Sequence, residues 1–311
     1  MSSMTLPVVI PVYGRDGVFA TIGFLRSQTD TAQLRFIVID NGNSAALSSR
    51  LRDMEADDCH VISFTENRGG SAAYIAGVEY AMSRFPESPY VWLLDDDAKP
   101  DERTLPGLCA EMDRLVRKDM RVASVGSAVV RPDMPDRIVE CGADFSPLLA
   151  HAWPKLRGRT LSKVGGVTLR VDFAAACSLL LNVAAVRELG FWEDVFIHFD
   201  DIEWGVRATL AGWHNYATTH SVVRHPEFDP KKAGAWVCYF DARNQYWFAA
   251  KFGPLHVAVV WLKNRMKDIR AVWTGVMKDG NAYRELAWRD YRAGVRRSRK
   301  EAVSAVEDQR R

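Results

Sequence analysis

The sequence predicts an α/β protein built around a mostly parallel sheet, and three features of its first 130 residues support this. Short apolar runs alternate with helix-like segments, which is the pattern of a parallel sheet covered by helices. Runs such as VVIPV and FIVID are apolar without interruption, as expected of strands buried on both faces. Several of these runs end in polar or glycine-containing stretches, and ligands of such sheets bind at the carboxyl ends of the strands.

We expect five strands and four helices in this region. The strands cover residues 6–12, 35–40, 60–65, 90–94 and 122–128, and the helices cover residues 17–27, 45–56, 72–85 and 104–118. The polar strand ends are residues 13–15, 40–42, 66–70 and 95–97. Because the carboxyl ends of parallel strands share one edge of a sheet, these four stretches should form a pocket there.

The second part of the chain has a different texture. From about residue 131, turn-forming residues indicate an irregular or antiparallel insert. A second ordered block, residues 165–254, contains the strand-like run VDFAAACSLLLN, a helix over residues 184–189 and a helix from Asp200 or Asp201 to about Gly212. We therefore divide the chain into a main domain of residues 1–254, with halves 1–130 and 131–254, and a C-terminal extension of residues 255–311.

Composition indicates a globular protein, with 48% hydrophobic residues in 311. The five cysteines are scattered without C-x-x-C spacing, so we expect reduced, buried thiols in a cytosolic protein. The N-terminus does not read as a signal peptide. No stretch reaches the roughly 18 apolar residues of a membrane span, so any membrane contact is expected to be peripheral.

The C-terminal extension is basic, with 14 lysines and arginines against 7 aspartates and glutamates in residues 255–311. Its cations alternate with aliphatic residues and with Trp261, Trp273 and Trp288. This pattern fits a helix at a membrane interface. It fits equally an amphipathic helix that packs on the rest of the protein, and the sequence leaves both open. Nucleic-acid binding is not favoured.

Three adjacent aspartates, Asp95, Asp96 and Asp97, follow the buried run of residues 90–94. Crowded carboxylates are costly unless a positive group joins them. Oxygen ligands at alternate positions suit Mg²⁺ or Mn²⁺. The competing interpretation is a loop whose aspartates form turns and cap the next helix.

A second acidic group could complete a catalytic site. Asp200, Asp201 and Glu203 stand where an apolar segment gives way to a helix, and His225 follows a later strand-like run. One aspartate would suffice as a helix cap, so three acids exceed that need. A cation at the triplet would stabilise a departing charge, while a carboxylate opposite removes a proton from an attacking hydroxyl.

The ordered motifs VVIPVYGR, FIVIDNGN, ENRGGSAAYIAG, LLDDDA, FIHFDDIEWGVR and YFDARNQYW resemble family 2 glycosyltransferases over residues 5–254. The resemblance implies the GT-A fold: a Rossmann-like, mostly parallel nucleotide-binding sheet flanked by helices, with an acceptor-side extension and C-terminal helices. By this resemblance, residues 1–254 are a catalytic domain whose nucleotide-sugar half is 1–130 and whose acceptor half is 131–254.

The resemblance also implies roles for individual residues. Asp95 and Asp97 would be the D-x-D metal ligands, and Asp96 would contact the donor sugar or ribose. Asp201 would be the catalytic base, with Asp200 orienting the acceptor. The nucleotide-sugar contacts would come from the first three strand ends: Pro11, Tyr13, Arg15, Asp40, Asn41, Asn67, Gly69 and Gly70.

Within the family, the pattern F-I-x-[FW]-D-D-x-x-[WY]-G-x-R with a following His is similar to galactofuranosyltransferases and rhamnosyltransferases of surface-polysaccharide synthesis. It implies that His225 completes the metal site, since imidazole is acceptable to Mn²⁺ beside carboxylates. Polymerising relatives carry a pair of tryptophans where this chain has Ala174, Ala175 and Ala176, which puts a polymerase in doubt. Trp192, Trp204 and Trp213 could stack on a sugar instead, although Trp204 and Trp213 fit core positions better.

We therefore expect a metal-dependent inverting hexosyltransferase. Its donor would be a UDP- or dTDP-linked sugar and its acceptor a glycan or polyprenyl-linked glycan, at the cytoplasmic face of the cell membrane. The oligomeric state is open. The alternative is a catalytically silent nucleotide-sugar-binding subunit of an assembly complex. A dinucleotide-dependent oxidoreductase is disfavoured because no G-x-G-x-x-G follows the first strand.

Overall fold

The computed structural model describes residues 5–28, 33–118, 121–227, 234–275 and 279–310. The chain divides into two compact units. The first comprises Met1–Asp144, Trp153–Asp194 and Asp200–Glu227, and the second comprises Phe145–Ala152, Val195–Phe199 and Phe228–Arg311.

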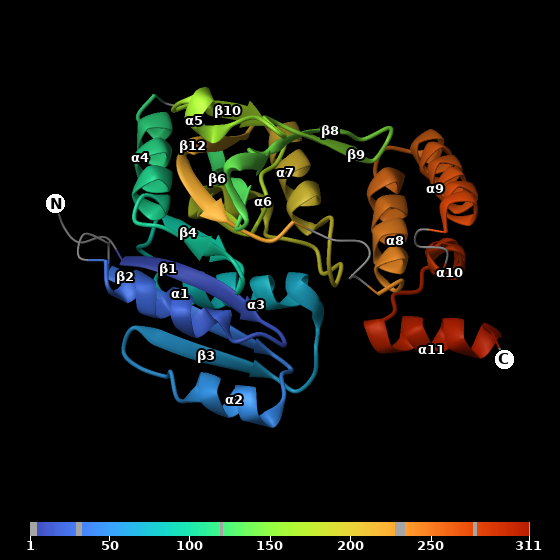
Figure 1. Cartoon of the computed structure of the whole chain (residues 1–311), viewed down its shortest axis with the longest axis horizontal. Coiled ribbons are helices and arrows are strands. Elements are labelled where there is room, and N and C mark those ends of the chain that lie inside the picture. Colours follow the sequence, from blue (N-terminus) through green and yellow to red (C-terminus); the bar gives the residue numbers. More distant parts are fainter. Residues whose placement is uncertain (1–4, 29–32, 119–120, 228–233, 276–278, 311) are drawn as a thin grey trace. The chain divides into compact units, whose positions relative to one another are not determined.

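Strands and helices alternate through the first 130 residues, as predicted (Figure 1). The strands are β1 (Thr5–Val12), β2 (Gln33–Asn41), β3 (Cys59–Phe64), β4 (Tyr90–Leu94), β5 (Lys99–Pro100), β6 (Val122–Arg131), β7 (Met134–Glu140), β8 (Ala143–Ser146), β9 (His151–Pro154), β10 (Thr168–Val171), β11 (Ser178–Asn182) and β12 (His214–Arg224). The helices are α1 (Gly17–Arg26), α2 (Ala45–Arg52), α3 (Gly69–Arg84), α4 (Thr104–Val116), α5 (Leu161–Val164), α6 (Val183–Leu189), α7 (Asp200–Leu210), α8 (Val237–Ala250), α9 (Pro254–Thr274), α10 (Gly280–Ala293) and α11 (Arg299–Arg310).

One mixed, mostly parallel sheet organises the first unit. Its strand order is β10-β12-β6-β11-β4-β1-β2-β3, with β5 on β12 and β7 on β6. Strands β4, β1, β2 and β3 pair in parallel, and so do β6 and β12. Strand β11 lies antiparallel between β4 and β6. The predicted α/β class is confirmed. The five predicted strands are not all neighbours in the sheet, because β11 separates β4 from β6.

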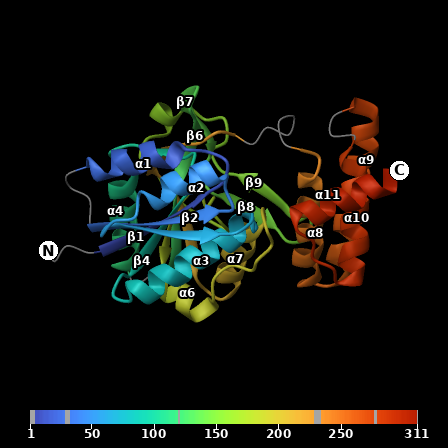
Figure 2. The same cartoon turned by 90° about the horizontal axis from the view of Figure 1, so that it is seen from below.

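Helices cover both faces of this sheet (Figure 2). On one face, α1, α2 and α4 bury residues such as Ile22 and Met112. On the other, α3, α6 and α7 bury residues such as Val78 and Trp204. Helix α3 lies very close to β1, because a Cβ at Gly77 would stand 2.2 Å from Cγ1 of Val9. Coverage of both faces explains why the strand sequences are apolar without alternation.

Three local predictions were wrong. The helix expected over residues 45–56 ends at Arg52, and Ala56 instead donates to Cys59 O at 2.8 Å. The other two differ because of contacts distant in sequence. Helix α3 begins at Gly69 rather than at residue 72, since side-chain oxygens satisfy its first N–H groups: Asn41 Oδ1 accepts from Arg68 N at 2.9 Å and Asn67 Oδ1 from Gly69 N at 2.8 Å. The strand expected over residues 171–182 is interrupted between β10 and β11. There, Cys177 O accepts from Asp95 N at 3.2 Å, which turns this segment toward the aspartate triplet.

The insert after residue 131 does contain antiparallel structure, since β7 pairs antiparallel with β6. In the second unit, α8 packs against α9 and α10 through aromatic contacts, among them Tyr246 with Trp288 at a ring distance of 5.1 Å. Tyr239 on α8 donates to Asp290 on α10 at 2.8 Å. The predicted boundary after residue 254 lies at the first residue of α9, within this unit.

Candidate active site

The three predicted metal ligands come together at the ends of β4 and β12. Asp95 and Asp97 follow β4, and β5 pairs with the last residues of β12, which brings this loop beside His225. His225 Nε2 lies 2.9 Å from Asp97 Oδ1 and 3.3 Å from Asp95 Oδ2. One ligand atom from each residue lies within 4.8 Å of the others. Two carboxylates and an imidazole at this separation fit a divalent cation such as Mn²⁺.

Neighbouring groups hold Asp95 in its ionised form. Burial raises the pKa of Asp95, but hydrogen bonds from His225 and Tyr74 and the charge of Arg15 outweigh it, so the pKa lies below its ordinary value. Tyr74 Oη donates to Asp95 Oδ1 at 2.6 Å. Burial and the Asp95 charge raise the pKa of Tyr74 well above its usual range, so the phenol stays a proton donor.

The loop after β1 is tied to the triplet. Tyr13 N donates to Asp96 Oδ2 at 3.3 Å, and the Arg15 guanidinium contacts both Asp96 and Asp97. The start of α1 lies directly on the same loop, because a Cβ at Gly17 would stand 2.6 Å from Asp96 O. Tyr13 is 44% exposed. Asp96 therefore joins two strand ends, while the ring of Tyr13 remains free to meet a ligand.

The ends of β2 and β3 are joined in a similar way. Asn41 Nδ2 donates to Gly69 O at 3.0 Å, and Asp40 Oδ1 accepts from Asn43 Nδ2 at 2.7 Å. Gly42 allows the two loops to touch, because a Cβ there would lie 2.2 Å from the Glu66 carbonyl carbon. Gly70 is the second residue of α3, and a Cβ on it would meet nothing within 4 Å.

These interactions place the predicted nucleotide-sugar residues on one rim of the sheet. Pro11 lies in β1, paired with Ile39 of β2, and the backbone of Asn67 approaches Gly42 closely. Their contacts with a nucleotide stay predictions.

The second acidic motif opens α7. Ser71 Oγ on α3 donates to Asp200 Oδ2 at 2.8 Å, and Ile202 N donates to Asp201 Oδ1 at 2.8 Å. Burial, the charge of Asp200 and the charge of Glu140 raise the pKa of Asp201 to about 8. The pKa of Asp201 therefore lies near neutral to mildly alkaline pH, the range in which a carboxylate can both be ionised and accept a proton effectively.

Residues 174–177 connect the two acidic motifs. Cys177 O accepts from Asp95 N, and the backbone of Ala176 is hydrogen-bonded to the Asp201 carboxylate. The charges of Asp95, Glu140 and Asp201 all contribute, after burial, to raising the pKa of Cys177 well above its usual range. Ala176 and Cys177 therefore lie at the site, whereas Ala174 is buried in the core between the sheet and its helices.

Sequence reasoning missed three polar residues at this site. Ser71 and Tyr74 stand three positions apart on α3, so they share a face, and Glu140 ends β7. Their signal was weak: Ser71 and Tyr74 sit in an apolar helical pattern, and Glu140 follows the short run RIV.

Side chains of the motif YFDARNQYW, on α8, donate hydrogen bonds to the backbone of the segment before Asp200. Asn244 Nδ2 donates to Ile197 O at 2.8 Å and to His198 O at 2.9 Å. Arg243 donates to Val195 O at 2.7 Å. Phe196, His198 and Phe199 have positive φ angles of 71°, 63° and 72°, a costly conformation for such residues. The hydrogen bonds from α8 fix this strained segment.

Two features lie apart from this chemistry. A cavity of about 470 Å³ is lined by Lys99, Arg103, Arg224 and other residues, and it includes none of the predicted site residues. Trp192, Trp204 and Trp213 are all buried and belong to the core between the sheet and its helices. They do not present a stacking surface to a sugar in this structure.

Comparison with known proteins identifies the first part of the chain. Residues 8–152 match the sequence profile described as Glycosyl transferase family 2. This match and the fold agree with the predicted enzyme class, a glycosyltransferase. Among curated proteins, none matches the chain.

Three solved structures share its fold. GalNAc-T7 with UDP, GalNAc and Mn²⁺ has a TM-score of 0.56 at 12% identity, over 79% of this chain and 51% of that one. TarS of S. aureus has 0.50 at 13%, over 78% and 39%. Mannosyltransferase PcManGT from Pyrobaculum calidifontis, with GDP-Man and Mn²⁺, has 0.52 at 15%, over 98% and 79%.

At such identities the likeness establishes the fold alone, and this chain spans about half the length of the first protein and less of the second. Together with the sequence match, it shows that residues 8–152 form a glycosyl transferase family 2 domain within a GT-A fold.

Proposed function

We propose that this protein is a metal-dependent, inverting hexosyltransferase that moves a galactofuranose- or rhamnose-type sugar from a nucleotide diphosphate to a glycan or lipid-linked glycan. The supporting observation is the pairing of two unlike acidic groups. Asp95, Asp97 and His225 gather three ligand atoms within 4.8 Å, and Asp201, near Asp95, has a pKa raised to about 8. The three ligand atoms suit a divalent cation, and the raised pKa of Asp201 suits a residue that accepts a proton.

The proposed reaction is a single displacement at the anomeric carbon. The carboxylate of Asp201 accepts the proton of the acceptor hydroxyl as that oxygen attacks, and Asp200, held by Ser71, orients the acceptor. Mg²⁺ or Mn²⁺ bound by Asp95, Asp97 and His225 would stabilise the charge of the departing diphosphate. Configuration inverts because one displacement occurs.

The proposed donor contacts follow the rim. Tyr13, Arg15, Asp40, Asn41, Asn67 and Gly70 would meet the nucleotide, Pro11 would lie beneath it, and Asp96 would contact the donor sugar or ribose. Arg15 is half exposed, and its guanidinium already contacts Asp96 and Asp97. It can therefore stabilise phosphate oxygens beside the cation site.

The acceptor side lacks the aromatic pair expected of a polymerase of the resembled kind. Ala174–Ala176 offer no aromatic platform, which supports single addition rather than polymerisation. None of the helices in the described part of the chain is long and apolar enough to cross a membrane. The basic C-terminal helices therefore support a peripheral contact at the cytoplasmic face, where a polyprenyl-linked acceptor would be presented.

A donor screen tests this function. The full chain is mixed with UDP-galactofuranose, dTDP-rhamnose or GDP-mannose, with Mn²⁺, with Mg²⁺ or with a chelator, and nucleotide release is measured. We expect metal-dependent release of UDP or dTDP. Release of GDP alone would overturn the galactofuranose or rhamnose assignment. Binding of a donor nucleotide without release or transfer to any acceptor would favour the catalytically silent subunit.

A further inference from the structure

Helix α9 has an exposed apolar stripe along its length. Leu255, Leu262, Met266, Ile269 and Trp273 are 66%, 55%, 62%, 61% and 87% exposed. Their spacing of seven, four, three and four residues places all five on one side of an α-helix. At about 1.5 Å per residue, the stripe is about 27 Å long. Single exposed apolar residues are common on proteins, whereas a continuous row of them marks an interaction surface.

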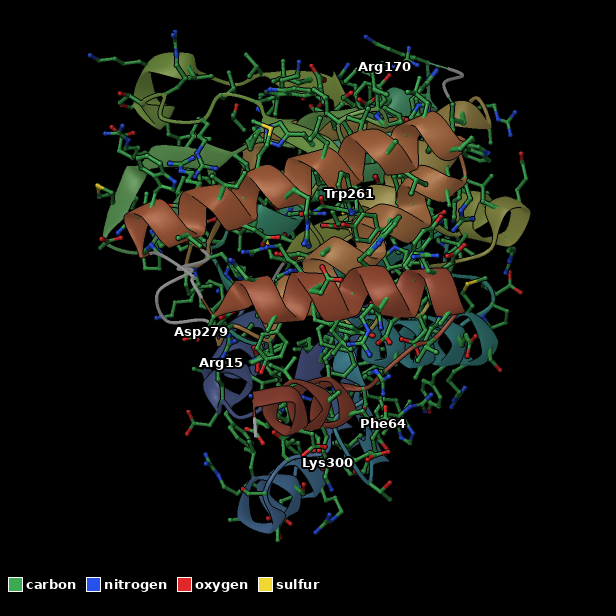
Figure 3. The ribbon with its side chains drawn as sticks, turned by 90° about the vertical axis from the view of Figure 1, so that its right-hand side faces the viewer. Arg15, Phe64, Arg170, Trp261, Asp279 and Lys300 are labelled. Carbon is green, nitrogen blue, oxygen red and sulfur yellow. The ribbon has the colours of Figure 1, made fainter. Side chains whose placement is uncertain are left out.

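The opposite side of α9 already supplies its packing face. Val260, Asn264 and Ala271 are buried there, and Trp261 packs near Trp288 of α10 at a ring distance of 6.4 Å. Figure 3 shows α9 and α10 with Trp261 labelled. The stripe is therefore a second apolar face, and it is additional to what the fold needs. Packing on the protein and contact with a membrane are properties of two different sides of one helix.

Basic residues follow one border of the stripe. Lys263, Lys267 and Arg270 lie on the same flank by helical position, and Lys267 and Arg270 are exposed. Nearby carboxylates are already paired: Asp268 contacts Arg265 and Arg284, and Glu285 contacts Arg265. Lys263 donates to Leu149 O at 2.6 Å and to Ala150 O at 2.8 Å, and burial lowers the pKa of both Lys263 and Lys267. Within the described residues Arg270 has no salt bridge, so it carries the free positive charge of this flank.

Charge decides between the occupants of such a stripe. Residues 255–311 carry 14 basic against 7 acidic residues, so a second copy of the chain would bring like charge against like charge. An anionic lipid surface brings opposite charge, and its acyl boundary receives a helix with one apolar face and a basic border. No described helix can span a membrane, so the fitting arrangement is a helix lying flat.

We propose that α9 lies in the plane of an anionic membrane, with the Leu255–Trp273 stripe in the boundary between headgroups and acyl chains. The inference gives the membrane contact of the proposed function a specific surface. The inference rests on the proposed function only for the reason why the protein would bind a membrane. The binding itself can be tested without measuring catalysis.

The test is flotation of the full chain with vesicles of phosphatidylcholine, alone or mixed with phosphatidylglycerol. We expect binding to the mixed vesicles and weaker binding to the neutral ones. The double variant Leu262→Gln, Ile269→Gln should lower the partition coefficient at least about 100-fold. Each apolar side chain that no longer enters the membrane lowers this coefficient about tenfold. Arg270→Glu should weaken binding to the anionic vesicles alone.

Leu210→Gln is the matched control, since Leu210 is 70% exposed on α7 and its replacement should leave flotation unchanged. A lack of flotation by the unaltered chain, or equal flotation of the stripe variant, would overturn the proposal. So would a lipid-free dimer that the stripe variant dissociates. Metal-dependent nucleotide release is measured on the same samples: its loss with flotation retained would count against the proposed function alone, and the reverse result against α9 alone.

Discussion

The surroundings of the two acidic motifs shift the pKa values of their carboxyl groups in opposite directions. Around Asp95, a histidine, a phenol and a guanidinium lower the carboxyl pKa despite burial. Around Asp201, burial and two further carboxylates raise it to about 8. A carboxylate that must hold a cation needs to stay ionised, and one that must take a proton needs affinity for it. The surroundings of each motif therefore distinguish roles that the residue type leaves identical.

The sharpest test of this contrast removes the proton acceptor. Asp201→Asn keeps an oxygen to accept from Ile202 N but cannot take a proton, so transfer should fall about 10²- to 10⁴-fold. Binding of Mn²⁺ and donor nucleotide should persist, as measured by calorimetry. Asp200→Asn is the companion variant, and its rate of transfer should fall less than that of Asp201→Asn. Transfer near the normal rate in Asp201→Asn would remove that residue from the mechanism.

The other motif is tested through its metal. Asp97→Ala removes one of three ligands, so Mn²⁺ affinity should fall by more than the roughly 10- to 100-fold that loss of an outer hydrogen-bond partner costs. Titration followed by electron paramagnetic resonance measures this. Asp53→Ala, an exposed aspartate at the end of α2, should change nothing. An unaltered titration in Asp97→Ala would restore the view of the triplet as a turn-forming loop.

A smaller effect is expected from the phenol that supports Asp95. Tyr74→Phe deletes the donor at 2.6 Å and should weaken Mn²⁺ binding about 10-fold without unfolding the protein. Tyr80→Phe on the same helix is the control, because Tyr80 stacks on His60 away from the site. Equal affinities for the two variants would contradict the supporting role of Tyr74.

The weakest expected effect is on stability, and it differs in sign between the motifs. The raised pKa of Asp201 contributes stability below the ordinary carboxyl range, and this is lost as the pH rises through about 8. The lowered pKa of Asp95 contributes stability that is lost as the pH falls through its folded value. Thermal melts of the chelated protein should show Asp201→Asn gaining on the unaltered chain as the pH rises from about 4 to about 8. A constant difference across that range would argue against the high proton affinity of Asp201.

Sequence reasoning reached the parts of the fold and site that depend on local pattern. The strands of the first half and the start of α7 follow from apolar runs and helix-start signals. The grouping of Asp95, Asp97 and His225 comes from the family resemblance rather than from local pattern. The insertion of β11 between β4 and β6 could not be predicted, since strand order is a tertiary property. Nor could the contribution of Glu140, because its effect on Asp201 depends on two distant segments meeting. The motif YFDARNQYW entered only as part of the family resemblance, so its position on the buried helix α8 was not predicted.

Helix α3 has a consequence for how this domain could diversify. Ser71 touches one acidic motif and Tyr74 touches the other, less than one turn apart on the same rigid rod. The spacing between the proposed leaving-group side and the proposed attacking side is thus set by a helix that itself carries no reacting group. Specificity for the sugar and the acceptor can therefore change through loops such as residues 174–177, while α3 keeps that spacing constant.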